Sequence, residues 1–278
     1  MLTKLSAWLT AANKLRTTAI LEINTISATV KTFTFQDKQC AKAKPGQFLM
    51  LWIPGVDEIP LSILDANEKE ATISVAVKKV GEATIALHSR KVGDLVGLRG
   101  PFGNGFTAKT GKLLMVAGGV GVVPLSFLAK KLASKALKIV FIIGAKTKDE
   151  LLFVKELKLL CGEENVTTVT EDGSCGVKGL ASEFAKKAMG KEKFDMIYAC
   201  GPELMARKVL DYAEKNGVSA EVSLERLMRC AIGICGSCML GKYRVCREGP
   251  VFNLTRLKDV KAEFGVWKRD FDGEKIPV

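Results

Sequence analysis

Residues 113–129 read LLMVAGGVGVVPLSFLA, and this stretch is the strongest indication of the fold in the central part of the chain. An apolar run is followed by a glycine-rich turn and then by an apolar segment that continues past Pro124. A turn of this kind between a strand and a helix aims backbone N–H groups at a phosphate and lets a pyrophosphate approach closely. The stretch therefore predicts a nucleotide site at Gly118, Gly119 and Gly121. It lacks the G-x-G-x-x-G fingerprint, so a turn that only packs strand against helix stays open.

Strands and helices alternate on the C-terminal side of this turn. Strand-like runs lie at 113–117, 138–144, 165–170 and 196–199, and helical stretches lie at 124–136, 148–160, 179–188 and 202–216. This order predicts a doubly wound parallel sheet over residues 108–222. Its last strand ends in Cys200, Gly201 and Pro202, a second tight turn at the sheet edge where ligands bind. Glu171 and Asp172 follow another strand. Beside an adenosine ribose they would favour NADH over NADPH, and otherwise they are solvated turn residues.

The N-terminal part has short β-branched runs separated by turn residues. The runs lie at 19–23, 30–35, 47–53, 71–77 and 95–98. The spacing predicts an antiparallel sheet closed into a small barrel over residues 17–107, with a short helix at 84–90. Residues 1–16 are expected to form an appended, partly helical N-terminal extension.

Four cysteines crowd into the segment CAIGICGSCMLGKYRVC, residues 230–246. Cys230, Cys235 and Cys238 match the C-x4-C-x2-C spacing of plant-type 2Fe-2S sites, and Cys246 supplies a fourth ligand. Glycines between them let the backbone bend around a cluster and turn N–H groups toward its sulfurs. The sequence thus predicts a 2Fe-2S segment over residues 223–278. The alternative is a structural zinc site, although such sites usually carry two paired C-x2-C knuckles.

Composition excludes several other classes of protein. The net charge of +12 comes from lysines and arginines spread along the chain, which does not favour a nucleic-acid groove. The longest uncharged stretch is short and broken by glycines, so no membrane span is predicted, and no signal peptide is recognisable at the start. Eight cysteines in a chain expected in the cytoplasm indicate metal or redox chemistry more than disulfides. The remaining four, Cys40, Cys161, Cys175 and Cys200, show no ligand spacing.

The motifs occur in an order that resembles a known family. They are IPLS, VGEAT, RGPFGNGF, AGGVGVVP, TEDGS, CGP and the cysteine segment, and they span residues 17–278. In this order they resemble the ferredoxin-NADP reductase superfamily and, within it, the electron-transfer subunits of type 1B dihydroorotate dehydrogenase. The resemblance implies an FAD-binding barrel, an NAD-binding α/β domain and a small C-terminal 2Fe-2S segment, which agrees with the three zones described above.

The resemblance also assigns cofactor-binding residues. Along the flavin it places Pro60, Leu61 and Ser62, with Ser62 near the reactive edge; at the FAD pyrophosphate Gly81, Ala83 and Thr84; and at the nicotinamide cofactor Gly118, Gly119, Gly121, Cys200, Gly201 and Pro202. One position departs from the family, because Ile59 stands where an arginine usually neutralises flavin phosphate. Because of that departure, the sequence does not distinguish FAD from FMN as the bound flavin. Lys78, Lys79 or Arg90 could supply the missing positive charge.

The implied activity is electron relay, with the chemistry carried by cofactors and no catalytic side chain. Hydride exchange between NADH and flavin would be followed by single-electron transfer through the cluster. The family implies a hetero-oligomer, a heterotetramer with an FMN-containing catalytic subunit that oxidises dihydroorotate to orotate in pyrimidine biosynthesis. The only histidine, His88, is expected to be structural. Two alternatives remain: the small or diaphorase subunit of an NADH-dependent ferredoxin:NADP oxidoreductase, hydrogenase or sulfite reductase, and a zinc-stapled nucleotide-binding module without enzyme activity.

Overall fold

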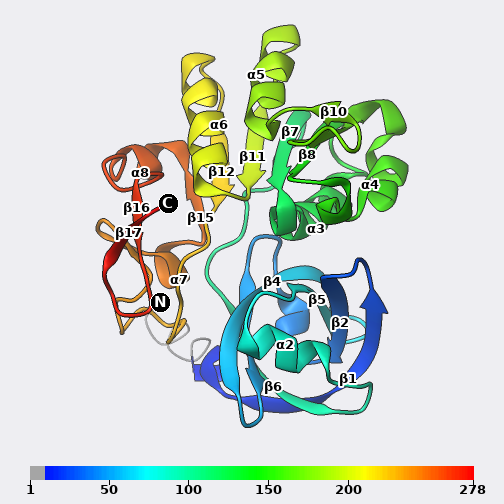
Figure 1. Cartoon of the computed structure of the whole chain (residues 1–278), viewed down its shortest axis with the longest axis vertical. Coiled ribbons are helices and arrows are strands. Elements are labelled where there is room, and N and C mark those ends of the chain that lie inside the picture. Colours follow the sequence, from blue (N-terminus) through cyan, green and yellow to red (C-terminus); the bar gives the residue numbers. More distant parts are fainter. Residues whose placement is uncertain (1–9) are drawn as a thin grey trace.

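The computed structural model describes residues 10–278, which form a barrel, an α/β part and a C-terminal segment (Figure 1). Most of the expected N-terminal extension lies outside the described residues. The part that is described is helical at residues 10–13 and leads directly into the first barrel strand. The predicted fold class, an antiparallel barrel followed by a parallel α/β sheet, is confirmed.

Six antiparallel strands close the barrel in the order β1-β2-β5-β4-β3-β6. They are β1 Arg16–Thr25, β2 Val30–Gln36, β3 Phe48–Ile53, β4 Asp57–Asn67, β5 Thr72–Lys78 and β6 Leu95–Phe102, with the turn η1 Cys40–Lys42 and the helix α2 Glu82–His88 between strands. The strand β4 is missing from the strands predicted above. Its acidic start and Pro60 hide the alternation, and the backbone pairing with β3 and β5 holds it extended.

The α/β part is a sheet in the order β10-β9-β8-β7-β11-β12 with a seventh strand at its end. Its parallel strands are β7 Lys112–Gly118, β8 Lys138–Ala145, β9 Val166–Thr170, β10 Val177–Lys178, β11 Met196–Cys200 and β12 Ala220–Ser223. The helices α3 Val122–Leu132 and α4 Val154–Cys161 cover one face, and α5 Ala181–Lys191 and α6 Glu203–Lys215 cover the other (Figure 1). The short turns η2 Gly119–Gly121, η3 Lys148–Glu150 and η4 Glu163–Asn165 complete it.

One predicted helix, 148–160, is split into two pieces. The chain forms η3, leaves helical geometry, and begins α4 after Phe153, which has a φ of 57°. Apolar side chains at the break, Leu151 and Leu152, pack into the core beside α3, and this burial outweighs the helical preference of the local sequence.

The C-terminal segment is docked on the α/β sheet. It contains β13 Met239–Leu240, β14 Tyr243–Arg244, α7 Val245–Glu248, β15 Val251–Asn253, α8 Leu254–Lys258, β16 Trp267–Arg269 and β17 Lys275–Pro277. The strand β15 pairs antiparallel with β12 and becomes the seventh strand of the sheet. None of the helices within residues 10–278 has the length and apolar character to cross a membrane.

Candidate functional site

The four clustered cysteines lie in two pairs. Cys230 lies beside Cys235 at the start of the loop, and Cys238 lies beside Cys246 on the side of the core, with weaker electrostatic interactions of Cys235 with Cys238 and of Cys230 with Cys246. Cys235 is exposed and Cys230 half-buried, whereas Cys238 and Cys246 are buried. The loop therefore presents one open edge and one edge packed into the protein.

Backbone N–H groups of the loop point at these sulfurs. The N–H of Ile234 donates to Cys230 Sγ at 3.4 Å, and the N–H of Cys246 donates to Cys238 Sγ at 3.4 Å. Gly233 and Gly236 adopt φ values of 82° and 77°, which the loop needs in order to bend this way. The same donors would stabilise the negative charge of cluster sulfurs.

The pKa values of the cysteines follow from these contacts. Burial raises the pKa of Cys230, but backbone N–H donors led by Ile234 outweigh it and bring that pKa down to about 7. The hydrogen bond from Cys246 lowers the pKa of Cys238 to about 7, and the pKa of Cys246 rises correspondingly. Two of the four sulfurs are thus prepared for the thiolate state that metal ligation requires.

This arrangement fits a two-iron cluster. Within residues 10–278, no three or more Cys, His, Asp or Glu side chains gather closely enough to hold a single metal ion. A tetrahedral zinc ion needs all four thiolates around one centre, whereas a 2Fe-2S cluster spreads its four cysteine ligands over two irons. Two pairs of thiols match the second requirement better.

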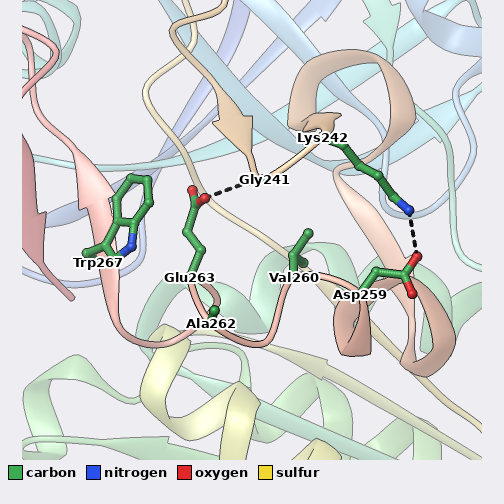
Figure 2. A pocket seen from close by; sticks show the side chains of 7 residues that line it. All are labelled: Gly241, Lys242, Asp259, Val260, Ala262, Glu263 and Trp267. Carbon is green, nitrogen blue, oxygen red and sulfur yellow. Dashed lines mark hydrogen bonds and ion pairs between the residues drawn. The ribbon is translucent and has the colours of Figure 1, made fainter.

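The hairpin β13–β14 separates the third and fourth cysteines and is tethered to the stretch 259–263 that follows α8 (Figure 2). Glu263 accepts the N–H of Gly241 at 2.8 Å, and Lys242 forms an ion pair of 3.0 Å with Asp259. These residues and Trp267 line a pocket of about 330 Å³. The spacing between Cys238 and Cys246 is set by the hairpin pairing and by the N–H of Val245, which donates to the Cys238 carbonyl at 3.1 Å, and the two tethers hold the hairpin in place.

The residues assigned to the flavin lie on β4 and at the start of α2. Ser62 is exposed, Pro60 and Leu61 are half-buried, and a side chain at Gly81 would meet no other atom within 4 Å. Thr84 caps α2, because its hydroxyl accepts the N–H of Gly81 at 3.0 Å. A half-buried apolar strand with an exposed hydroxyl, next to open space at a helix start, can accept a flavin ring and its phosphate chain.

The residues proposed to replace the missing arginine are partly engaged elsewhere. Ile59 packs against the barrel core. Lys78 forms an ion pair of 2.9 Å with Glu150, and Arg90 donates to the carbonyl of Pro54 at 3.2 Å. Lys79 is exposed. Within residues 10–278 its side chain forms no hydrogen bond or ion pair, unlike those of Lys78 and Arg90. Of the three side chains, Lys79 is therefore the one left available for a flavin phosphate, and that role stays a prediction.

The two glycine turns of the α/β part lie against each other. Strands β7 and β11 are neighbours, with Ala117 opposite Cys200. A side chain at Gly121 would come within 2.2 Å of the Cys200 carbonyl oxygen, and one at Gly201 within 2.8 Å of the Cα of Gly118. Gly119 has nothing within 4 Å and a φ of 54°. The turns thus form one continuous backbone surface with open space above Gly119.

Polar groups near this edge have defined roles. Burial, together with the charge of Glu225, raises the pKa of Cys200 to about 12, so its thiol stays neutral. Asp172 accepts the N–H and the hydroxyl of Ser174 at 2.9 and 2.7 Å, which holds the pKa of Asp172 below its usual value. Glu171 is exposed on the same turn. Its approach to a ribose stays a prediction.

The helix α3, which follows the first glycine turn, contacts β4, the strand to which the resemblance assigns the flavin. Phe127 of α3 is buried in the barrel core, and Lys130 forms an ion pair of 2.8 Å with Asp65 of β4. The sequence did not predict β4 as a strand. It also did not single out Glu225, whose charge acts on Cys200, or Arg99, which contacts the cysteine loop at Cys230. The available signal for Arg99 was a single charge within the otherwise apolar LVGLRGPF.

Comparisons with known proteins agree with this arrangement. Residues 225–258 match the family model described as the iron-sulfur cluster binding domain of dihydroorotate dehydrogenase B, and residues 115–211 match the oxidoreductase NAD-binding domain. A probable dihydroorotate dehydrogenase B (NAD(+)) electron transfer subunit of Methanocaldococcus jannaschii is 43% identical, over 92% of this chain and 96% of its own length. A protein of the same description from Pyrococcus furiosus is 42% identical, over 95% of this chain and 100% of its own length.

Solved structures show the same fold. A chain of an NADH-dependent reduced ferredoxin-NADP oxidoreductase, studied for flavin-based electron bifurcation, has a TM-score of 0.76 and 30% identity, covering 88% of this chain and 91% of its own. A ferredoxin NADP+ reductase from Neisseria gonorrhoeae with bound FAD and NADP has a TM-score of 0.62 and 19% identity, covering 73% and 92%.

Proposed function

The chain belongs to the family of dihydroorotate dehydrogenase B electron-transfer subunits, and from that premise we propose that it relays electrons between dihydroorotate oxidation and NAD. It is an oxidoreductase subunit whose cofactors are FAD, a 2Fe-2S cluster and NAD(H). When bound, these cofactors supply hydride exchange and single-electron transfer. The function belongs to pyrimidine biosynthesis.

The observation that carries the proposal is the pairing of the four cysteines beside the barrel. Cys238 and Cys246 share one apolar core with Phe48 and Met50 of the barrel strand β3, which pairs with the flavin strand β4. The chain's own residues hold and orient: Pro60, Leu61 and Ser62 for the flavin, and the four cysteines for the irons. Cofactors held on the two sides of one core can exchange electrons over a short path.

The nicotinamide would lie over Gly119, between the two glycine turns. The neutral thiol of Cys200 and backbone N–H groups of both turns would orient it toward the flavin strand that α3 contacts. Glu171 would favour NADH by repelling a 2′-phosphate. These assignments divide the chain into a flavin barrel at 17–107, an NAD part at 108–222 and a cluster segment at 223–278.

An electron-transfer subunit requires a catalytic partner subunit. We infer that this partner carries FMN, oxidises dihydroorotate to orotate and forms a heterotetramer with the chain in the cytoplasm. The single histidine of the chain supports a separate catalytic partner, because it is not free to act as an acid or base. His88 Nε2 lies 2.8 Å from the carbonyl oxygen of Val77 and is hydrogen-bonded there. The acid-base chemistry of dihydroorotate is then left to the partner.

The likeness to the ferredoxin-NADP oxidoreductase chain favours one second candidate. That protein is 30% identical and is an NADH-dependent oxidoreductase studied for flavin-based electron bifurcation. The two functions share cofactors and differ in the partner that receives or supplies electrons.

The test is to purify the chain with its co-expressed partner under anaerobic conditions and to follow the visible spectrum. We expect flavin and cluster absorption to bleach both with NADH and with dihydroorotate. Reduction by NADH without any reduction by dihydroorotate would favour the second candidate. A preparation that holds zinc and no flavin would overturn both.

A further inference from the structure

Arg99 connects three segments that lie far apart in the sequence. It belongs to β6, and its guanidinium binds both carboxylate oxygens of Glu58 on β4, at 2.7 and 2.5 Å. Its third nitrogen donates to Asn13 Oδ1 at 2.5 Å and lies 3.5 Å from the carbonyl oxygen of Cys230. One side chain therefore contacts the strand assigned to the flavin and the first cysteine of the cluster loop.

The strand register shows why Arg99 lies at this junction. Met50 on β3 pairs with Pro60 on one side and with Arg99 on the other, so the three side chains form one row on one face of the sheet. Ser62, Phe48 and Phe102 form the next row. The face that carries Pro60 and Ser62 is thus the face that packs on the cluster segment.

The apolar part of this junction is already packed. Phe48, Met50 and Phe102 lie in one buried core with cluster-segment residues that include Cys238 and Cys246. Arg99 lies at the margin of this core, with its guanidinium carbon 5.6 Å from the centre of the Phe102 ring and its side chain 15% exposed. Cys238 and Cys246 are buried in this core, whereas Cys230 packs at its margin, where Arg99 approaches its carbonyl oxygen.

We propose that Arg99 is a positioning residue for electron transfer between flavin and cluster, a role that rests on the function proposed above. It holds the Cys230 end of the loop against the flavin strand and so fixes the separation and orientation of the two cofactors. Its positive charge, paired with Glu58, lies beside the Cys230 carbonyl, and charge is one of the factors that set cluster potential.

Arginine suits this role because its planar guanidinium forms two parallel bonds to Glu58 and still keeps a nitrogen for other acceptors. A lysine has one nitrogen and a more mobile stem, and it cannot make the same set of bonds in a fixed geometry. Lysine keeps the charge, however. The two substitutions Arg99→Lys and Arg99→Gln therefore separate geometry from charge.

The experiment uses the chain loaded with FAD and cluster, mixed with NADH under anaerobic conditions. Stopped-flow absorbance reports flavin reduction, and rapid-freeze EPR reports cluster reduction. We expect Arg99→Lys and Arg99→Gln to reduce flavin at the wild-type rate but to pass electrons to the cluster about tenfold more slowly, since small misplacements cost rate steeply. The cluster midpoint potential should fall in Arg99→Gln and stay near wild type in Arg99→Lys.

The matched control is Arg16→Lys. Arg16 forms an ion pair of 2.6 Å with Asp37, has a side chain 22% exposed on the same barrel, and makes its hydrogen bonds within residues 11–100. It should leave both rates and the potential unchanged. If the Arg99 variants fail to fold, Glu58→Gln replaces them, because it keeps Arg99 but weakens the contact that orients its guanidinium. We expect this variant to slow cluster reduction by less than the Arg99 variants do.

Cluster reduction at the wild-type rate in the Arg99 and Glu58 variants, as in Arg16→Lys, would overturn the inference while leaving the relay intact. A wild-type chain whose flavin is reduced by NADH but whose cluster never is would instead overturn the proposed function, and this inference with it.

Discussion

The thiol of Cys235 is the exposed corner of an otherwise half-buried or buried set. Cys230, Cys238 and Cys246 are held by backbone donors and core packing, whereas Cys235 has a 3.5 Å contact with the Ser237 hydroxyl as its side-chain hydrogen bond. Among the four cysteines, Cys235 is therefore the one whose substitution should remove a cluster ligand with the least effect on folding.

Replacing Cys235 by alanine should remove the cluster without unfolding the chain. Three thiolates cannot complete the four-cysteine ligand set of a 2Fe-2S cluster. We expect iron content to fall by about tenfold or more, while NADH still bleaches the flavin. The matched control is Cys175→Ala, which should keep its iron; loss of flavin reduction together with iron would contradict separate sites.

His88 predicts a dependence of stability on pH. Burial lowers the pKa of His88, and the positive charges of Lys31 and Lys79 lower it further. As pH falls below about 6.5, the unfolded chain therefore binds a proton that the folded chain does not, and folded stability decreases. The stability that the neutral His88 contributes is therefore fully present above the pKa of histidine in the unfolded chain. It is lost as the pH falls toward the lower pKa of His88 in the folded chain.

The change His88→Gln should reduce this acid sensitivity, because glutamine does not titrate and can still donate to the Val77 carbonyl. Urea unfolding at about pH 7.5 and about pH 5.5 measures it. The wild type should lose more stability than the variant between the two pH values. Equal losses would show that other groups control acid unfolding.

At the scale of elements, the strand–turn–helix unit at residues 112–132 depends on glycines for two different reasons. Gly121 and Gly201 have no room for a side chain, because the turns after β7 and β11 touch through their backbones. Gly119 has room, and its constraint is a positive φ together with the open space above it. Only Gly119 can be enlarged without separating the strands.

The variant Gly119→Leu should weaken NADH binding selectively. Its side chain would occupy the space assigned to the nicotinamide, and we expect the KM for NADH to rise about tenfold or more, the equivalent of about 1.4 kcal/mol. Iron content should not change. The control is Gly217→Leu, with a φ of 65° and nothing within 4 Å, because it carries a similar backbone cost of about 1–2 kcal/mol away from the site. Similar KM increases in both variants would indicate a general folding defect.

For the whole molecule, the cluster segment is fixed by polar contacts as well as by β15. Glu203, at the start of α6, binds the guanidinium of Arg226 through both oxygens and also accepts the N–H of Gly265 at 2.6 Å. The side chains of Arg226 and Glu203 are 3% and 7% exposed. This buried pair joins both ends of the C-terminal segment to the NAD part.

Replacing Arg226 by methionine should lower the free energy of unfolding by about 3–5 kcal/mol, because the buried Glu203 carboxyl group would lose its partner. Chemical denaturation of the holo chain measures the change. The exposed pair Lys158–Glu163 is the control, since Lys158→Met should cost no more than about 1 kcal/mol. A small effect at Arg226 would mean that β15 and the apolar core alone dock the segment.

The predicted cofactor sites differ in how much of them sequence could reveal. The glycine turns and the cysteine spacing are local patterns, because a few consecutive residues carry their geometry. The strand β4 was not predicted, since Pro60 and the acidic residues before it break the alternation, and only pairing with β3 and β5 makes it a strand. The role of Arg99 could not be found either, because its contacts at residues 13, 58 and 230 are remote in sequence.

The fold class and the order of the three zones followed from the amino-acid sequence, because periodicity and motif spacing are short-range properties of a chain. The four cysteines as cluster ligands stay a prediction from their spacing. Only the tertiary structure shows that the two glycine turns touch and that one barrel face carries both Pro60 and the contact with the cluster segment. Those features arise where strands distant in sequence are brought into register. Burial of shared apolar surface, which depends on the whole fold, selects that register.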